Sequence, residues 1–291
     1  MGAVVAAVGD DTAGRRRIAI PVPADRTPIA TTRCAVAIAR QGGFSVEFVG
    51  AAGGRGASIE QTVRQRCAAA IAVGAPRVSW QVVDGGPAAI GPYITWSGAS
   101  LCCVGTVAHR HASTAAAAGA GAVPLLVVGP CCRPSDSGYR HLVVGLDSGS
   151  DQSEHVAATA VALAARMAAE VTLIEVVAPG RTVLDVPPSA HLYWVASGLD
   201  RPPRLFDTVA ARRAAPGLAR FLDPGTVVVV GAPGHHRSVL GGVAGRLVRR
   251  APCPVLVVPA ATAPRTCCTA ADRRSRSRAG TTTRAAPMSR G

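Results

Sequence analysis

The apolar residues of this chain gather in short unbroken runs between about residues 15 and 260, and polar stretches separate the runs. An unbroken aliphatic run bounded by glycine or proline is typical of a strand that is buried on both faces of a parallel sheet. The predicted strands cover residues 18–22, 45–50, 77–84, 100–105 and 124–129 in the first half, and 141–147, 171–177, 204–210, 226–231 and 254–259 in the second.

Stretches with the apolar spacing of helices lie between most of these runs. The clearest begins after Asp151, which has with Glu154 the spacing of a capping box. Residues 179–203 are rich in proline and predict a connection rather than a helix. Strands that alternate with helices predict the α/β class, with a parallel sheet covered on both faces. The other predicted helices end at Arg40, cover 58–73, form weakly between 84 and 100, cover 212–222 and end at Arg250.

The same pattern occurs twice. Residues 15–25 correspond to 139–149, residues 101–111 to 227–237, and residues 122–130 to 252–260, at offsets of about 125 residues. The repeat predicts two tandem doubly wound domains, 15–130 and 139–260, each with a five-stranded parallel sheet of Rossmann-like type. Residues 261–291 have no apolar period and predict a disordered basic tail.

Composition narrows the chemistry that the chain can perform. All 31 basic residues are arginine. A phosphate loop of the Walker type and Schiff-base catalysis both need lysine, so both are excluded. Part of the net charge of +14 lies in the tail, where seven arginines stand against Asp272. Nucleic-acid binding by a folded face is not expected, and a loose attachment of the tail to nucleic acid is a weaker alternative.

The cysteines and the first residues of the sequence indicate the cellular compartment in which the protein is expected. The nine cysteines form no C-x-x-C pair, and no set of cysteine and histidine has zinc-ligand spacing, so no metal site is expected. An odd count in a chain of this size favours a reducing compartment. Adjacent pairs such as Cys131 and Cys132 leave a redox role open. We find no signal peptide and no apolar run that could span a membrane, so a cytoplasmic protein is expected.

Three stretches of the second half resemble the universal stress protein family. Residues 143–153 (VVGLDSGSDQS) resemble its first strand, where an aspartate ends the strand before a turn that contains serine. Residues 227–236 (VVVVGAPGHH) resemble its fourth strand and G-x-x-G, and residues 249–259 (RRAPCPVLVVP) resemble its last element. The resemblance covers 139–259 well and 15–130 more faintly. It implies a five-stranded doubly wound domain and a regulatory or sensing role in the stress response.

The resemblance also implies where ATP, with Mg²⁺, binds in those members of the family that bind it. Asp147 matches the aspartate that ends the first strand, and Val176 matches the position on the second strand that contacts adenine. Gly231 and Gly234 match G-x-x-G, where backbone N–H groups at a helix start point at phosphates. Such a site lies at the topological switch point of the sheet.

The chain departs from the family's pattern after Gly234. Nine residues should separate it from a Gly-Ser or Gly-Thr pair, but Ala244 and Gly245 stand there. Anchoring on the A-P-C-P run instead places Gly241 and Gly242 at the pair, with a shorter loop and no hydroxyl.

Two interpretations of this altered loop remain open. In one, the shortened loop still binds phosphate and its basic cluster (His235, His236 and Arg237) supplies the missing contacts. In the other, the glycines only let a helix pack tightly against the sheet.

The first half matches the site pattern poorly. Ala108 replaces the second glycine, and Pro23 stands where the aspartate should be. An enzyme is not expected, because no G-x-S-x-G element or pair of acid–base carboxylates is present, although slow ATP hydrolysis stays open. His155 is expected to be an exposed residue of a helix start.

These alternatives imply different binding partners. In the first function the partner is an adenine nucleotide. In the alternative function the chain is a scaffold that binds no nucleotide and acts through an unknown protein partner. The resemblance also implies a homodimer interface, because the family often dimerises through its last strand, here Val255–Val258. In a tandem chain the two domains can instead pair at this edge within the chain.

Overall fold

The computed structural model describes residues 16–22, 29–52, 56–106, 123–147, 152–177, 190–232, 240 and 242–260. The first half contains β1 (Arg17–Val22), α1 (Ile29–Gly42), β2 (Ser45–Ala52), α2 (Gly56–Ala72), β3 (Val78–Asp84), η1 (Pro87–Ala89), α3 (Ile90–Trp96), β4 (Leu101–Gly105) and β5 (Leu125–Val128). The second half contains β6 (His141–Leu146), α5 (Gln152–Met167), β7 (Glu170–Val177), α6 (Ala190–Ser197), β8 (Leu205–Ala210), α7 (Ala214–Ala219), β9 (Thr226–Gly231), α8 (Gly242–Arg250) and β10 (Val255–Val258).

The strands form one ten-stranded sheet in the order β3-β2-β1-β4-β5-β10-β9-β6-β7-β8. Within each half all neighbouring strands are parallel, as the unbroken aliphatic runs predicted. The two halves have the same internal order, with the first strand between the second and the fourth. The predicted α/β class, with a five-stranded doubly wound parallel sheet in each half, is confirmed.

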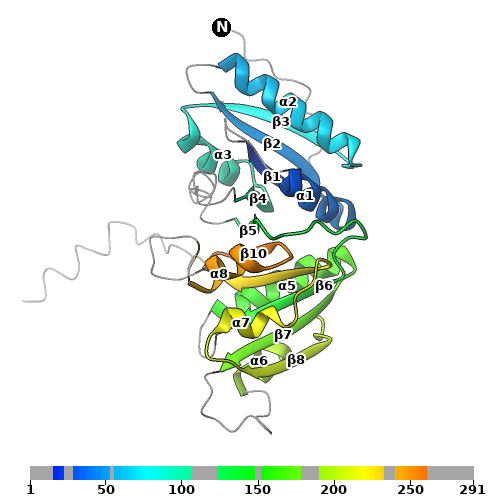
Figure 1. Cartoon of the computed structure of the whole chain (residues 1–291), viewed down its shortest axis with the longest axis vertical. Helices are drawn as coiled ribbons and strands as arrows, with labels where there is room; N and C mark the ends of the chain where they lie inside the picture. The colour runs from blue at the N-terminus through cyan, green and yellow to red at the C-terminus, as the bar shows by residue number, and fades with distance from the viewer. Residues whose placement is uncertain are drawn as a thin grey trace, which may run out of the picture. The chain divides into compact units, whose positions relative to one another are not determined.

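The two five-stranded halves of the sheet meet at β5 and β10, which form the one antiparallel pair among the described strands (Figure 1). Val255 pairs with Val127 and Leu256 with Leu126. Of the two outcomes that the sequence left open for the last strand, pairing within the chain is the one observed. The edge strands of the joined sheet are β3 and β8.

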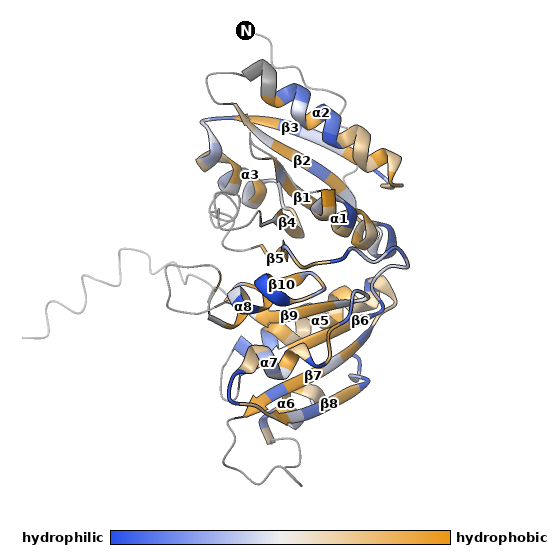
Figure 2. Ribbon diagram, viewed as in Figure 1, coloured by the Kyte–Doolittle hydropathy of each residue, from blue (hydrophilic) through white to orange (hydrophobic). Residues whose placement is uncertain are grey.

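Two apolar cores cover the two faces of the sheet. Successive residues of each strand alternate between them, so that Leu142 and Val144 belong to one core and Val143 to the other. Helices α1, α2, α5 and α6 cover the first face, and α3, α7 and α8 cover the second. The central strand β9 is buried nearly throughout and is coloured hydrophobic in Figure 2. Burial on both faces explains why these strands lack a polar alternation.

A close approach at the junction requires one glycine. A Cβ atom on Gly129, just after β5, would lie 1.8 Å from the main-chain oxygen of Val248 in α8. No side chain fits there, so a helix of the second half packs directly on the end of a first-half strand. The linker between β5 and β6 is also held on α1, where the Gln41 side-chain amide donates to the carbonyl oxygen of Tyr139 over 3.1 Å.

One sequence prediction was wrong in part. The connection predicted for 179–203 contains the helix α6. No proline stands between Pro188 and Pro202, and Leu192 and Val195, at helical spacing, are buried in the first core. Proline at both ends of the stretch concealed this helix. No helix of the described residues is long and apolar enough to cross a membrane. The tail lies outside the described residues, and the predicted domain bounds stay predictions.

Candidate functional site

The strand register brings three of the predicted site residues together at one edge of the sheet. Leu146, the last residue of β6, pairs with Glu175 of β7, so Asp147 adjoins Val176. On the other side of β6, Gly145 pairs with Val230, so the end of β6 also adjoins Gly231. Because all three strands are parallel, these residues lie at the carboxyl edge.

This edge is the switch point of the second half. The chain passes from β6 to β7 on one side, and it later returns to place β9 on the other side of β6. The two crossovers leave β6 in opposite directions, and a crevice at the carboxyl ends of the strands is where doubly wound sheets bind ligands. The predicted location of the site is therefore one at which this fold class can hold a small molecule.

The start of α5 is fastened to this edge. The Ser153 hydroxyl donates to the carbonyl oxygen of Asp147 over 3.0 Å, and the Gln152 side-chain amide donates to the carbonyl oxygen of Val258 over 3.1 Å. A Cβ atom on Gly231 would lie 3.1 Å from the side-chain carbon of Gln152. Asp147 itself is exposed. The carbonyl group of Asp147 is thus held in place, and no hydrogen bond of its carboxylate to another described residue is seen.

The side chain of Val176 packs into the molecule. A methyl group of Val176 would lie 3.1 Å from a Cβ atom on Gly217, so the side chain packs toward α7. It lies against the second core. The main-chain contact with adenine that the family resemblance implies for this position stays a prediction.

The glycines of α8 do not serve packing against the sheet. A Cβ atom on Gly242 would meet no atom of the described residues within 4 Å. A Cβ atom on Gly245 would lie 3.7 Å from the carbonyl oxygen of Leu240, which is ordinary van der Waals contact. Tight packing therefore does not explain these two glycines. The other predicted loop residues, Gly234, His235, His236, Arg237 and Gly241, lie outside the described residues.

Glu175 is a polar residue of this region that the sequence predictions did not include. The residue is 1% exposed, and neither carboxylate oxygen has a hydrogen-bond partner among the described residues. Its neighbour in register, Thr208 of β8, has a buried hydroxyl without a partner as well. A buried carboxylate is costly unless a donor or a cation meets it. The signal in the sequence was a single glutamate inside the aliphatic run VTLIEVV.

In the first half, the position that corresponds to Glu175 is packed with apolar groups. Val22, the last residue of β1, pairs with Gly50, just as Leu146 pairs with Glu175. A Cβ atom on Gly50 would lie 2.8 Å from a methyl group of Val63 and 2.9 Å from Ile59, both in α2. The helix packs against the glycine and closes this part of the edge. The polar position is thus a feature of the second half alone.

Other candidate chemistry finds little support. His155 is exposed in the first turn of α5, as predicted. Within the described residues no group of three or more histidine, cysteine or carboxylate side chains could hold a metal ion.

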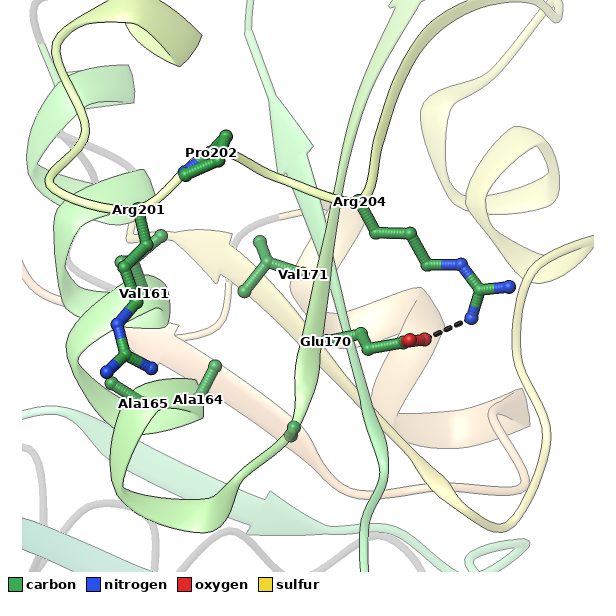
Figure 3. Close-up of a pocket in the computed structure, with 9 residues that line it drawn as sticks. Val161, Ala164, Ala165, Glu170, Val171, Arg201, Pro202 and Arg204 are labelled. Carbon is green, nitrogen blue, oxygen red and sulfur yellow. Dashed lines mark hydrogen bonds and ion pairs between the residues drawn. The ribbon is translucent and has the colours of Figure 1, made fainter.

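A pocket of about 230 Å³ lies at the opposite end of β7 (Figure 3). Small apolar residues of α5 line one side, and Arg201 reaches over them. Arg204 pairs with Glu170, the first residue of β7, in an exposed ion pair that contributes little stability. Since Asp147 and Gly231 lie at the other edge of the sheet, this pocket is not part of the predicted nucleotide site.

Comparisons with known proteins bear on the family and the fold. Residues 138–192 match the universal stress protein family. No curated protein matches the chain. The structure of a universal stress protein from Archaeoglobus fulgidus is similar with a TM-score of 0.61 at 13% identity, and the match covers 84% of this chain and 98% of that one. A candidate universal stress protein from Pseudomonas aeruginosa UCBPP-PA14 has a TM-score of 0.55 at 13% identity, covering 85% and 94%.

A universal stress protein in complex with cAMP also matches, with a TM-score of 0.34 at 21% identity, over 39% of this chain and 96% of that one. The matched segment 138–192 contains β6, α5 and β7, and hence Asp147 and Val176. The resemblance to the universal stress protein family that the sequence indicated is therefore confirmed, through this segment and through a fold shared with solved universal stress proteins.

Proposed function

We propose that the chain is a cytoplasmic regulatory protein of the stress response that binds an adenine nucleotide, ATP with its Mg²⁺, in the second half. The observation that carries the proposal is the register that sets Asp147, Val176 and Gly231 side by side at the switch point. The proposal includes no rapid turnover of the nucleotide, in keeping with the lack of a G-x-S-x-G element or a pair of acid–base carboxylates in the sequence.

The polar groups at this edge suit the parts of a nucleotide. The exposed Asp147 carboxylate can accept hydrogen bonds from ribose hydroxyls, and the main chain near Val176 can pair with the adenine edge. The open space at Gly242 lies at the first residue of α8, where unpaired N–H groups favour phosphate. Mg²⁺ would arrive with the phosphates and neutralise part of their charge.

Glu175 adds support from the energetics of burial. A carboxylate with two unpartnered oxygens beneath the edge needs a donor, and a ligand amine or hydroxyl could supply one directly or through water. The first half has Gly50 at this position and packs it with α2. The proposal therefore assigns one nucleotide to each chain, in the second half.

Isothermal titration with Mg-ATP tests the proposal. Wild type should bind, and Asp147→Asn should weaken binding roughly tenfold or more, since a hydrogen bond to a charged acceptor contributes about 1.5–3 kcal/mol. Asp84→Asn is the matched control, because Asp84 is also an exposed aspartate at the end of a strand but belongs to the first half. Absence of binding by wild type at millimolar Mg-ATP, or equal loss in both variants, would contradict the proposal.

A scaffold that binds another protein is the second candidate function. Tyr193 and Trp194 of α6 are 52% and 59% exposed, and Leu205 at the start of the edge strand β8 is exposed as well. Exposed aromatic side chains gathered beside an edge strand are typical of protein contacts. If titration shows no nucleotide binding, this function becomes the first candidate.

A further inference from the structure

Two thiols from distant parts of the chain meet at the junction of the two halves. The Sγ atoms of Cys34, in α1, and Cys132, in the linker between β5 and β6, lie 3.8 Å apart. The two residues are 98 positions apart in the sequence. Cys34 is fully buried and Cys132 is 8% exposed. The sequence drew attention to adjacent cysteines, whereas the structure pairs cysteines that are remote from each other.

The linker is held on α1 at two further points, made by residues of α1 that lie before and after Cys34. Gln41 makes two hydrogen bonds to Tyr139, one to its carbonyl oxygen and one from its N–H group. Arg33, next to Cys34, forms a 2.6 Å ion pair with Asp136 of the linker. These contacts fix the two main chains beside each other, so a small side-chain rotation brings the sulfur atoms to bonding distance.

The two thiols have different acidities. The hydrogen bond between Cys34 and Cys132 lowers the pKa of Cys34 more than burial raises it, and Tyr139 and the charge of Arg33 lower it further. The pKa of Cys132 is raised, first by that same hydrogen bond and then by burial. Within the pair, Cys34 is therefore the nucleophilic sulfur and Cys132 is the proton donor.

We propose that Cys34 and Cys132 form a reversible disulfide when the protein meets a hydroperoxide. The Cys34 thiolate attacks one peroxide oxygen, the O–O bond breaks, and the leaving oxygen takes up a proton to depart as water or an alcohol. Cys34 is then a sulfenic acid. The Cys132 sulfur attacks it, an S–S bond forms, and the expelled hydroxide takes the Cys132 proton and leaves as water. Two thiols are oxidised and one peroxide is reduced.

Access to the pair comes from the linker rather than from the sheet. Residues 129–140 contain no helix or strand, so they can open locally without separating β5 from β10. Most buried cysteines do not react, because oxidants cannot reach them. The rate at which the linker opens therefore limits the rate of this reaction. Cys102, which lies inside β4, has no such path, and burial raises its pKa to about 12. The reaction is therefore expected to be selective among the buried thiols.

The disulfide would bind α1 covalently to the segment that leads into β6. It would thus fasten the first half to the second across the junction that Gln41 and Tyr139 already hold. Oxidation should stabilise the protein, because a bond across 98 residues restricts the unfolded chain.

Peptide mapping of the full-length protein tests this. The reduced protein is treated with hydrogen peroxide, alkylated and digested at arginine without reduction. A cross-link between the Cys34 peptide and the peptide that contains Cys131 and Cys132 is expected. Cys131→Ser should keep the cross-link, and Cys132→Ser should lose it. Cys67→Ser, which removes a buried thiol of α2, is the matched control and should keep it.

Thermal unfolding gives a second measurement. Oxidation should raise the melting temperature of wild type and of Cys131→Ser, and dithiothreitol should reverse the rise. Neither Cys132→Ser nor Cys34→Ala should show it, and their circular dichroism reports whether each variant folds. A cross-link that survives in Cys132→Ser would make Cys131 the partner and overturn the proposal. So would oxidation confined to Cys131, or no cross-link in wild type.

Discussion

Replacing Gly242 by alanine separates nucleotide binding from folding. Gly242 is the first residue of α8, its φ angle lies outside the left-handed region, and an added Cβ atom would meet none of the described residues within 4 Å. Alanine is therefore compatible with the native backbone. Glycine in a helix costs about 0.5–1 kcal/mol relative to alanine, so Gly242→Ala should raise the free energy of unfolding by up to that amount.

The same methyl group should oppose phosphate binding. If the N–H groups at the start of α8 hold a phosphate, the ligand occupies the space that the methyl group would enter. Loss of one charge-assisted hydrogen bond costs about 1.5–3 kcal/mol, which raises the dissociation constant roughly 10- to 150-fold. A variant that is more stable and binds more weakly cannot be explained by damage to the fold.

Calorimetric titration with Mg-ATP and urea unfolding measure the two effects on the same samples. Gly245→Ala is the matched control, because Gly245 lies one turn further along α8 and its added Cβ atom would make only ordinary contact. It should gain similar stability and keep the affinity of wild type. Equal affinity in wild type and Gly242→Ala would refute the placement of phosphate at this helix start.

Three further predictions concern stability. Gly129→Ala should lower the free energy of unfolding by about 3 kcal/mol, because the Cβ atom would overlap the Val248 carbonyl oxygen, and a change below about 1 kcal/mol in urea would contradict the close approach. Arg17→Met should cost about 3 kcal/mol in the same assay, since it removes the charged partner of the buried Glu47 carboxylate and leaves it only the Tyr93 hydroxyl, whereas replacing both Arg17 and Glu47 by apolar residues should cost less. Burial lowers the pKa of His141 below 6.5 in the folded state, so the unfolded state binds a proton at this residue more readily. The free energy of unfolding should therefore fall as the pH drops below about 6.5. His141→Gln should flatten this part of the pH profile of unfolding.

Much of the fold was predictable because burial on both faces leaves a plain signal. The runs around Ile18–Val22 and Val227–Val230 have no polar alternation, and each became a strand of the parallel sheet. The repeat then gave both halves the same strand order. The helix α6 escaped prediction because its flanks are rich in proline. Its own eight residues are too few for a clear helical period.

The junction could not be predicted from the pattern. An exposed last strand needs a partner, but its residues do not say whether that partner is another chain or the strand β5. The close approach at Gly129 depends on where α8 ends relative to β5, and one glycine after a strand gives no sign of it. The contact of Cys34 with Cys132 depends in the same way on the path of the linker over α1.

Candidate site residues at the ends of strands could be predicted from the sequence, whereas a candidate residue inside a strand could not. Asp147 and Gly231 follow aliphatic runs, and parallel strands bring such ends to one edge. Glu175 lies within a run, where its partner cannot be read from the sequence. Its lack of a hydrogen-bond partner became evident only with the packing around β7.

The two halves have diverged at one edge while keeping one fold. The first half closes the position of Gly50 with Ile59 and Val63, and the second half keeps a carboxylate there. The first half instead supplies β5, which covers the last strand of the second half. Pairing β10 with β5 within one chain does not depend on protein concentration. If the second half binds nucleotide as we propose, that binding therefore needs no second chain to cover β10.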